Sequence, residues 1–162
     1  MSKVDFVFPD GVYVREGGPI PGVRVRPLRR LPDERGTIHH ILSSADPDFV
    51  RFGEVYASTV VHQAVKGWHK HEEMTLNYAC LHGRVKCVLL FETNGRTSIM
   101  EVFLGPDSPL LLTIPPRIWN GFKGLSAPDA IIVNVCTHAH DPGRTTRLPP
   151  DAFPYDWARK DH

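Results

Sequence analysis

The chain has 162 residues, a length that favours one domain with a substantial core. Its 19 Lys and Arg residues nearly balance its 18 Asp and Glu residues, so neither nucleic acid nor an anionic membrane is an expected partner. The first residues lack the pattern of a secretion signal, and no apolar run approaches the roughly 18 residues of a membrane span. We therefore expect a soluble cytoplasmic protein.

Short strand-like segments with apolar or alternating patterns follow one another along most of the chain. In chain order we expect strands at residues 12–15, 22–28, 37–42, 49–62 (one or two strands), 65–71, 75–81, 84–91, 97–104, 110–114, 117–125 and 129–137. Residues 29–36 are expected to form a charged turn, and the Asn94-Gly95 pair is typical of a hairpin turn. Beyond His138 the chain is rich in proline and glycine, and at most one loose helical turn is expected there.

The near-regular spacing of these strands, without a convincing 3.6-residue apolar period, predicts an all-β sandwich or jelly roll. We divide the chain into an N-terminal arm over residues 1–21, a β-barrel over residues 22–137, and an extended tail over residues 138–162 that packs on the barrel. Nothing in the sequence indicates a repeat or an internal linker.

The central stretch Val65–His71 reads Val-Lys-Gly-Trp-His-Lys-His and holds two histidines two positions apart. Strand side chains alternate between two faces, so His69 and His71 would project from the same face. Lys66 adds a cation three residues before His69, and Gly67 allows the backbone to approach a ligand closely. We therefore interpret this strand as the floor of a functional site.

A His-x-His pair on a strand has three interpretations: metal ligands, an acid–base pair, or solvated histidines without a function. Metal-binding cupins with this motif also use an acid a few residues later and a histidine in a Pro-x-Gly-x-x-His motif. Here the acid position falls on Thr75 or Leu76, and Asn120 stands where the histidine would be. An amide is a poor ligand for Zn²⁺ or Fe²⁺, so we expect no metal and no cofactor.

The chain resembles the dTDP-4-dehydrorhamnose 3,5-epimerases, metal-free cupins that act on a nucleotide-linked 4-keto-6-deoxyhexose. The resemblance runs from about residue 23 to residue 157. It rests on Asp33, Arg35-Gly36, Lys66-Gly67-Trp68-His69, Ile114-Pro115-Pro116 and Asn120-Gly121-Phe122. It implies a cupin jelly roll (a double-stranded β-helix), a homodimer, and a nucleotide-sugar substrate such as a dTDP-sugar, whose product would enter polysaccharide biosynthesis.

The resemblance also implies roles for individual residues. His69 falls on the catalytic base that removes a proton next to the 4-keto group. Lys66 falls on an arginine that holds phosphate. Lysine keeps the positive charge but cannot form the bidentate contact that an arginine makes with phosphate. Arg35 falls on an arginine that reaches the nucleotide, often that of the partner subunit. Asn120 replaces the second-motif histidine, and Asn134 falls on the tyrosine that serves as general acid.

With that tyrosine absent, His71, Tyr78 and His138 are the substitutes that we consider for the acid. A partial resemblance to the sugar-nucleotide 3,4-ketoisomerases favours a catalytic role for His71, because their Arg-Gly-x-His-Ala-His motif uses both histidines to shuttle protons. Trp68 and Trp119 are candidates for stacking on the nucleobase, although large aromatic residues in all-β proteins also serve as core.

Three functions follow from these observations. The first is a sugar-nucleotide epimerase or isomerase that uses His69 as base without a metal. The second is a non-catalytic cupin that binds a nucleotide sugar or a small carbohydrate. The third is a metal-dependent cupin enzyme that uses His69, His71 and a nearby glutamate. We expect the first, an isomerase of the 3,5-epimerase type.

Overall fold

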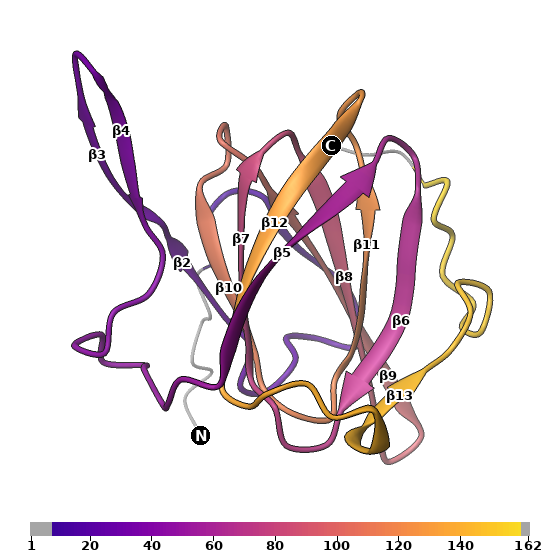
Figure 1. Ribbon diagram of the computed structural model, residues 1–162. Helices are drawn as coiled ribbons and strands as arrows, with labels where there is room; N and C mark the ends of the chain where they lie inside the picture. Colours follow the sequence, from indigo (N-terminus) through magenta and orange to yellow (C-terminus); the bar gives the residue numbers. More distant parts are fainter. Residues whose placement is uncertain (1–7, 160–162) are drawn as a thin grey trace.

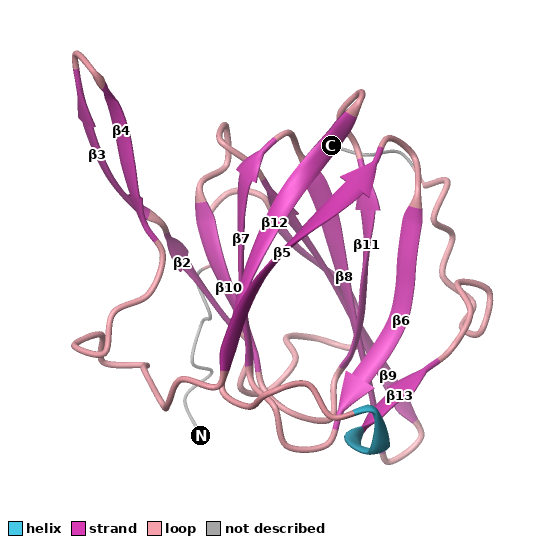
Figure 2. Ribbon diagram, in the orientation of Figure 1, coloured by secondary structure: helices cyan, strands magenta, loops and turns pink. Residues whose placement is uncertain are grey.

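Two antiparallel sheets face each other in the computed structural model, which describes residues 8–159 (Figures 1 and 2). The six-stranded sheet has the order β1-β9-β8-β11-β6-β13, formed by Val12–Glu16, Arg96–Leu104, Val85–Thr93, Trp119–Gly124, Val65–His71 and Thr145–Arg147. The five-stranded sheet has the order β2-β10-β7-β12-β5, formed by Arg24–Pro27, Leu110–Ile114, Leu76–His82, Asp129–Cys136 and Glu54–Val61. The all-β, cupin-like jelly roll expected from the sequence is confirmed.

The apolar core lies between the two sheets and follows from the alternation of side chains along each strand. Leu76, Tyr78 and Cys80 of β7 belong to the same buried cluster as Met100 and Val102 of β9. The intervening residues of both strands point to the outer faces. The site described below lies at one end of this interior, where polar side chains replace apolar ones.

The C-terminal tail packs on the outer face of the six-stranded sheet, beside β6 (Figure 1). Trp68 of β6 is completely buried there, with ring centroids 5.3 Å from Phe153, 6.1 Å from Tyr155 and 5.1 Å from Trp157. A short 3₁₀ helix, η1 (Pro142–Arg144), leads into β13, which pairs with β6 and forms the sheet edge. The tail therefore both covers this sheet and extends it.

A β-hairpin projects away from the barrel (Figure 1). Its strands are β3 (Arg29–Asp33) and β4 (Gly36–His40), and they pair only with each other among the described residues. The prediction of a charged turn over residues 29–36 is therefore wrong for the first five of them. Every residue of β3 is exposed, so the strand carries no apolar alternation that sequence reasoning could detect.

Two further details differ from the sequence-based division of the chain. Residues Val12–Glu16 form β1 and pair with β9, so part of the expected N-terminal arm belongs to the six-stranded sheet. The tail contributes β13, a strand that was not expected. Within residues 8–159, no helix is long and apolar enough to cross a membrane.

Candidate active site

A cavity of about 550 Å³ opens between the two sheets. Strands β5, β6, β7, β11 and β12 line it, and the C-terminal tail closes one side. The lining residues are Glu54, Tyr56, Ser58, Lys66, Gly67, His69, His71, Tyr78, Phe122, Ile132, His140 and Arg147. Imidazoles, phenols, cations and a carboxylate thus share one space with a few apolar side chains, as in a typical small-molecule site.

Both histidines of the central motif enter this cavity, because β6 is a regular strand and positions 69 and 71 share a face. Their ring centroids lie 5.6 Å apart. The Nε2 atom of His69 lies 3.3 Å from the hydroxyl of Tyr78 on β7, and the Nδ1 atom of His71 lies 3.0 Å from the hydroxyl of Thr145 on β13. Each imidazole therefore has a fixed partner on a different neighbouring element.

Burial and nearby positive charge keep both imidazoles neutral. Burial lowers the pKa of His69 to about 3, and repulsion from His71 and Arg147 acts in the same direction. Burial likewise lowers the pKa of His71 to about 4, with contributions from His140 and Arg147. At neutral pH each ring therefore carries one N–H and one lone pair, the form in which an imidazole can accept a proton.

Two tyrosines enter the cavity from the five-stranded sheet, which faces the histidines. Tyr78 of β7 is fully buried, and burial raises its pKa well above the ordinary value. Tyr56 of β5 is partly exposed to the cavity, and its hydroxyl is hydrogen-bonded to that of Tyr78. Burial raises the pKa of Tyr56, whereas the hydrogen bonds from Asn134 and Tyr78 oppose that increase. Both phenols therefore keep their protons at neutral pH.

Asn134 connects these phenols to the buried interior of the five-stranded sheet. It is completely buried, and its Oδ1 accepts from the backbone N–H of Asn77 at 3.1 Å. That contact fixes the orientation of the amide, so Nδ2 is the atom that donates to the hydroxyl of Tyr56 at 3.0 Å. Asn134 was expected to touch substrate. The structure instead places it behind Tyr56, outside the residues that line the cavity.

Lys66 lies on the cavity wall and is exposed to solvent. Its Nζ donates to the hydroxyl of Ser58 at 2.7 Å and to the carbonyl of Thr59. The ammonium group is thus held toward β5, where an anionic group of a ligand could reach it.

The structure does not bring the two predicted stacking residues into the cavity. Trp68 is completely buried in the aromatic cluster under the tail, and its indole N–H donates to the carbonyl of Pro150 at 3.1 Å. Trp119 packs against Phe153 and lies under the ammonium group of Lys70, on the same outer face. Trp68 precedes His69, which faces the cavity, and Trp119 precedes Asn120, which faces inward. Because side chains alternate along a strand, both tryptophan rings point outward. They act as core, the second of the two roles considered for them.

Two other predicted residues also lie away from the cavity lining. Asn120 pairs with His69 across β11 and β6, and its side-chain amide donates to the carbonyl of His69 at 3.3 Å. It therefore supports the backbone of His69. Arg35 lies at the tip of the β3–β4 hairpin, where its guanidinium pairs with Asp33 at 2.7 Å and remains 82% exposed. Within one chain it is not part of the cavity.

Sequence reasoning missed several lining residues, and for one group a signal existed. Glu54, Tyr56 and Ser58 alternate with Val55 and Ala57 along β5, a pattern that places three polar side chains on one face. Arg147 and His140 carried no such signal, because the tail was expected to lack a strand.

The histidines were also considered as metal ligands. Among residues 8–159, no group of three or more His, Cys, Asp or Glu side chains is arranged to hold a metal ion. The hydrogen-bond partners of His69 and His71 are the hydroxyls of Tyr78 and Thr145, which are poor ligands for Zn²⁺ or Fe²⁺ when protonated. The described residues therefore do not fit the metal centre of a metal-dependent cupin.

Comparison with known proteins gives concordant matches. The family model described as FdtA: WxcM-like, C-terminal matches residues 21–147. The crystal structure of a dTDP sugar isomerase from Desulfovibrio desulfuricans G20 is 34% identical, with a TM-score of 0.82 over 88% of this chain and 94% of that chain. The spore coat polysaccharide biosynthesis protein SpsL of Bacillus subtilis (strain 168) is 26% identical over 128 residues, which make up 76% of this chain and 83% of that protein.

A dTDP-4-dehydrorhamnose 3,5-epimerase from Sulfolobus tokodaii shares the fold, with 18% identity and a TM-score of 0.74 over 89% of this chain and 88% of that chain. The family match and the 34% identical dTDP sugar isomerase confirm the predicted enzyme class, an isomerase or epimerase that modifies sugar nucleotides. Since the family model matches most of the chain, the chain belongs to the WxcM-like, C-terminal (FdtA) family.

Proposed function

We propose that the enzyme acts on a nucleotide-linked 4-keto-6-deoxyhexose, most simply a dTDP-sugar, and epimerises it next to the keto group without a metal. One observation carries this proposal: the imidazole of His69 and the phenol of Tyr56 enter one cavity from facing sheets. Epimerisation needs a base on one face of the sugar and an acid on the other. A sugar ring held between the sheets would present one face to each group.

In the first step, His69 takes the proton from the carbon next to the carbonyl, and the electron pair of that C–H bond moves into the carbonyl to form an enolate. The low pKa of His69 keeps its lone pair free before the reaction. As negative charge develops on the enolate oxygen, it stabilises the imidazolium, so the base strengthens during the transfer. Arg147 lies on the same cavity wall and supplies positive charge for the enolate.

In the second step, Tyr56 donates its proton to the carbon from the opposite face, which inverts the centre. Its oxygen accepts hydrogen bonds from Asn134 and Tyr78, so the hydroxyl hydrogen is left for the substrate and the phenolate is stabilised when that hydrogen leaves. The proton on His69 then returns to Tyr56 through solvent. The enzyme ends the cycle in its starting state, with no oxidant or reductant consumed.

The nucleotide part would be held by cations at the cavity mouth. Lys66 lies on the cavity wall, and its ammonium group would contact a phosphate. Arg35 lies on the projecting hairpin and does not line the cavity of its own chain, so we assign it to the nucleotide in the site of a second copy, within a homodimer. Exposed apolar side chains on β5 and the adjacent β12 support such an assembly: Val55 is 55% exposed, Val61 59% and Ile131 36%.

A second reaction is favoured by His71. Its ring shares the cavity with His69 at a centroid separation of 5.6 Å, about the distance at which two bases could serve adjacent carbons. Two such histidines would suit movement of the carbonyl from C4 to C3, the reaction of the sugar-nucleotide 3,4-ketoisomerases. In that case Tyr56 would hydrogen-bond the sugar without delivering a proton to carbon.

Product analysis separates these reactions. The protein is incubated with dTDP-4-keto-6-deoxyglucose, and the product is identified by proton NMR. Inverted coupling at C3, alone or with C5, is the expected result and establishes an epimerase. A carbonyl at C3 would establish the keto isomerase instead. An unchanged sugar that remains bound would contradict both reactions for this substrate and would favour a binding role. The product of either reaction would be a precursor for polysaccharide biosynthesis.

A further inference from the structure

We propose that Thr145 is a positioning residue that holds His71 in the tautomer with its proton on Nδ1, so that Nε2 presents a lone pair to the substrate. This inference rests on the second of the two proposed reactions in one respect: it assumes that His71 takes part in the proton transfers, as in the keto isomerase. The tautomer itself follows from the hydrogen bonds around Thr145.

The hydroxyl of Thr145 has one hydrogen to donate. That hydroxyl lies 3.1 Å from the backbone carbonyl of Asp141 and 3.0 Å from Nδ1 of His71. Two oxygens 3.1 Å apart need a hydrogen between them, and a carbonyl oxygen can only accept, so the single hydrogen of Thr145 is directed to Asp141. The hydroxyl oxygen can then only accept from His71, and Nδ1 must carry a proton. Because the pKa of His71 is about 4, the ring is neutral at neutral pH and Nε2 has no proton.

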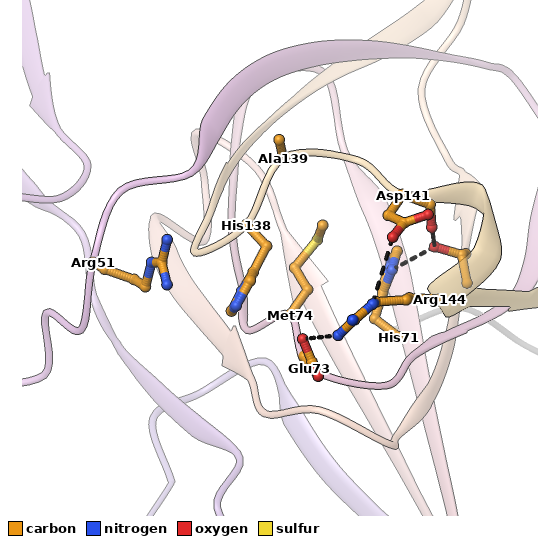
Figure 3. A pocket seen from close by; sticks show the side chains of 9 residues that line it. Arg51, His71, Glu73, Met74, His138, Ala139, Asp141 and Arg144 are labelled. Atoms are coloured by element: carbon orange, nitrogen blue, oxygen red, sulfur yellow. Dashed lines mark hydrogen bonds and ion pairs between the residues drawn. The ribbon is translucent and has the colours of Figure 1, made fainter.

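The partners of this hydroxyl are held in place by a compact local structure. Thr145 begins β13 directly opposite His71 of β6, so the two side chains lie on the same face of the sheet. The carboxylate of Asp141 caps the η1 turn by accepting from the N–H of Gly143 at 2.9 Å. Arg144 then forms ion pairs with both Asp141 and Glu73 (Figure 3). The Asp141 carbonyl, which accepts the hydrogen bond from Thr145, is therefore fixed relative to β6.

His71 also occupies a boundary between two cavities. It lines the large cavity together with His69, and it lines a smaller cavity of about 310 Å³ together with Thr145 and Asp141 (Figure 3). Thr145 does not line the large cavity. The hydrogen bond thus engages Nδ1 on the side of the smaller cavity and leaves Nε2 as the ring nitrogen available to a substrate. Without Thr145, the ring could exchange its proton between the two nitrogens.

The tautomer can be measured without turnover. The two ring nitrogens of a neutral imidazole differ widely in ¹⁵N chemical shift according to which one carries the proton. We would record long-range ¹H–¹⁵N correlations of histidine-labelled protein near neutral pH and assign His71 by the loss of its signals in His71→Gln. The proposal requires the Nδ1–H form in the wild type and in Thr145→Ser. It also requires a shift toward the Nε2–H form in Thr145→Val.

Thr146→Val is the matched control, since Thr146 is exposed and pairs with Lys70. This variant should leave the His71 signals unchanged. An Nε2–H ring in the wild type, or an unchanged ring in Thr145→Val, would overturn the tautomer assignment. That result would stand whether or not the protein converts any nucleotide sugar, so it is separable from a failure of the proposed function.

Turnover tests the role of the tautomer. We expect Thr145→Val to lower kcat about 10-fold or more with little change in KM, because a base with its proton on the wrong nitrogen still binds substrate. Thr145→Ser should restore most of the activity. If Thr145→Val shifts the tautomer but keeps its kcat, His71 does not act through Nε2 and the positioning role is contradicted.

Discussion

Asn134 and Tyr56 lie directly opposite each other on β12 and β5, and the amide of Asn134 donates to the phenol of Tyr56 at 3.0 Å. The sequence comparison placed the general acid of the 3,5-epimerases at position 134, where this chain has an amide. A phenol, that of Tyr56, lies on the neighbouring strand, and the amide of Asn134 donates a hydrogen bond to it. The asparagine at position 134 thus pairs across the strands with a tyrosine, and the proposed mechanism assigns the acid to that tyrosine.

Removing the phenol should uncouple proton abstraction from inversion. We expect Tyr56→Phe to lower kcat for epimerisation by about 10²-fold, the lower end of the usual contribution of a general acid. The base on the opposite face remains, so deuterium from D₂O should still enter the substrate. NMR measures both quantities in one sample. Tyr13→Phe, on β1 outside the cavity, is the control. Equal loss of inversion and exchange in Tyr56→Phe would contradict the assignment of Tyr56 as acid.

The rate should not fall near pH 6.5, the usual pKa of a histidine. Burial holds the pKa of His69 at about 3 and that of His71 at about 4, so both remain unprotonated over most of the acidic range. We expect kcat/KM to stay nearly constant from about pH 8 to about pH 5. A decrease centred near pH 6.5 in the initial rates would show that an ordinary histidine controls the reaction.

The same pKa shift makes the stability of the fold depend on pH. The unfolded chain binds a proton at His69 below about pH 6.5, whereas the folded chain does not until about pH 3. The stabilisation is therefore present above pH 6.5 and is lost as the pH falls toward 3. In this window His69 contributes a slope of up to about 1.4 kcal/mol per pH unit to the free energy of unfolding.

Urea unfolding of the wild type and of His69→Asn, each measured near pH 7 and pH 5, tests this slope. The variant should lose less stability between the two pH values than the wild type. His82→Asn is the control, because His82 is exposed on the opposite sheet. Parallel pH dependences for the wild type and His69→Asn would show that His69 is not buried in the neutral form.

The assignment of Arg35 to a second subunit predicts complementation. Arg35→Ala and His69→Asn should each be inactive as pure dimers, the first through weak nucleotide binding and the second through loss of the base. Mixed dimers contain one site with both intact residues, so subunit exchange should restore about a quarter of the wild-type activity. Activity that stays at the level of the separate variants, in a sample shown to contain mixed dimers, would place Arg35 outside the partner's site.

How far the sequence predicted the site depended on where each residue lies. His69, His71 and Lys66 were found because alternation along one regular strand fixes their faces. The same rule applied to residues 54–58 would have found Tyr56, but the segment was considered only for its strand propensity. Arg147 and Thr145 lie on a three-residue strand that forms only because β6 offers an open edge. Such long-range pairing leaves no periodic pattern in the local sequence.

The fold was predictable for a similar reason. Strands buried on at least one face carried clear apolar patterns, and most of them appear at the expected positions. The exposed strand β3 was mistaken for a turn because no core selects its side chains. Alternation turns Trp68 and Trp119 outward, but their role as core depends on the tail, whose aromatic residues create a second buried cluster on that face.

Exchange with solvent measures directly whether His69 removes a proton next to the keto group. Dilute enzyme is added to dTDP-4-keto-6-deoxyglucose in D₂O, and proton NMR follows the signals at C3 and C5. We predict loss of signal at one or both carbons with the wild type and with His82→Asn, and a rate at least about 10²-fold lower with His69→Asn. Equal exchange rates in the wild type and His69→Asn would contradict the account, because another group would then be the base.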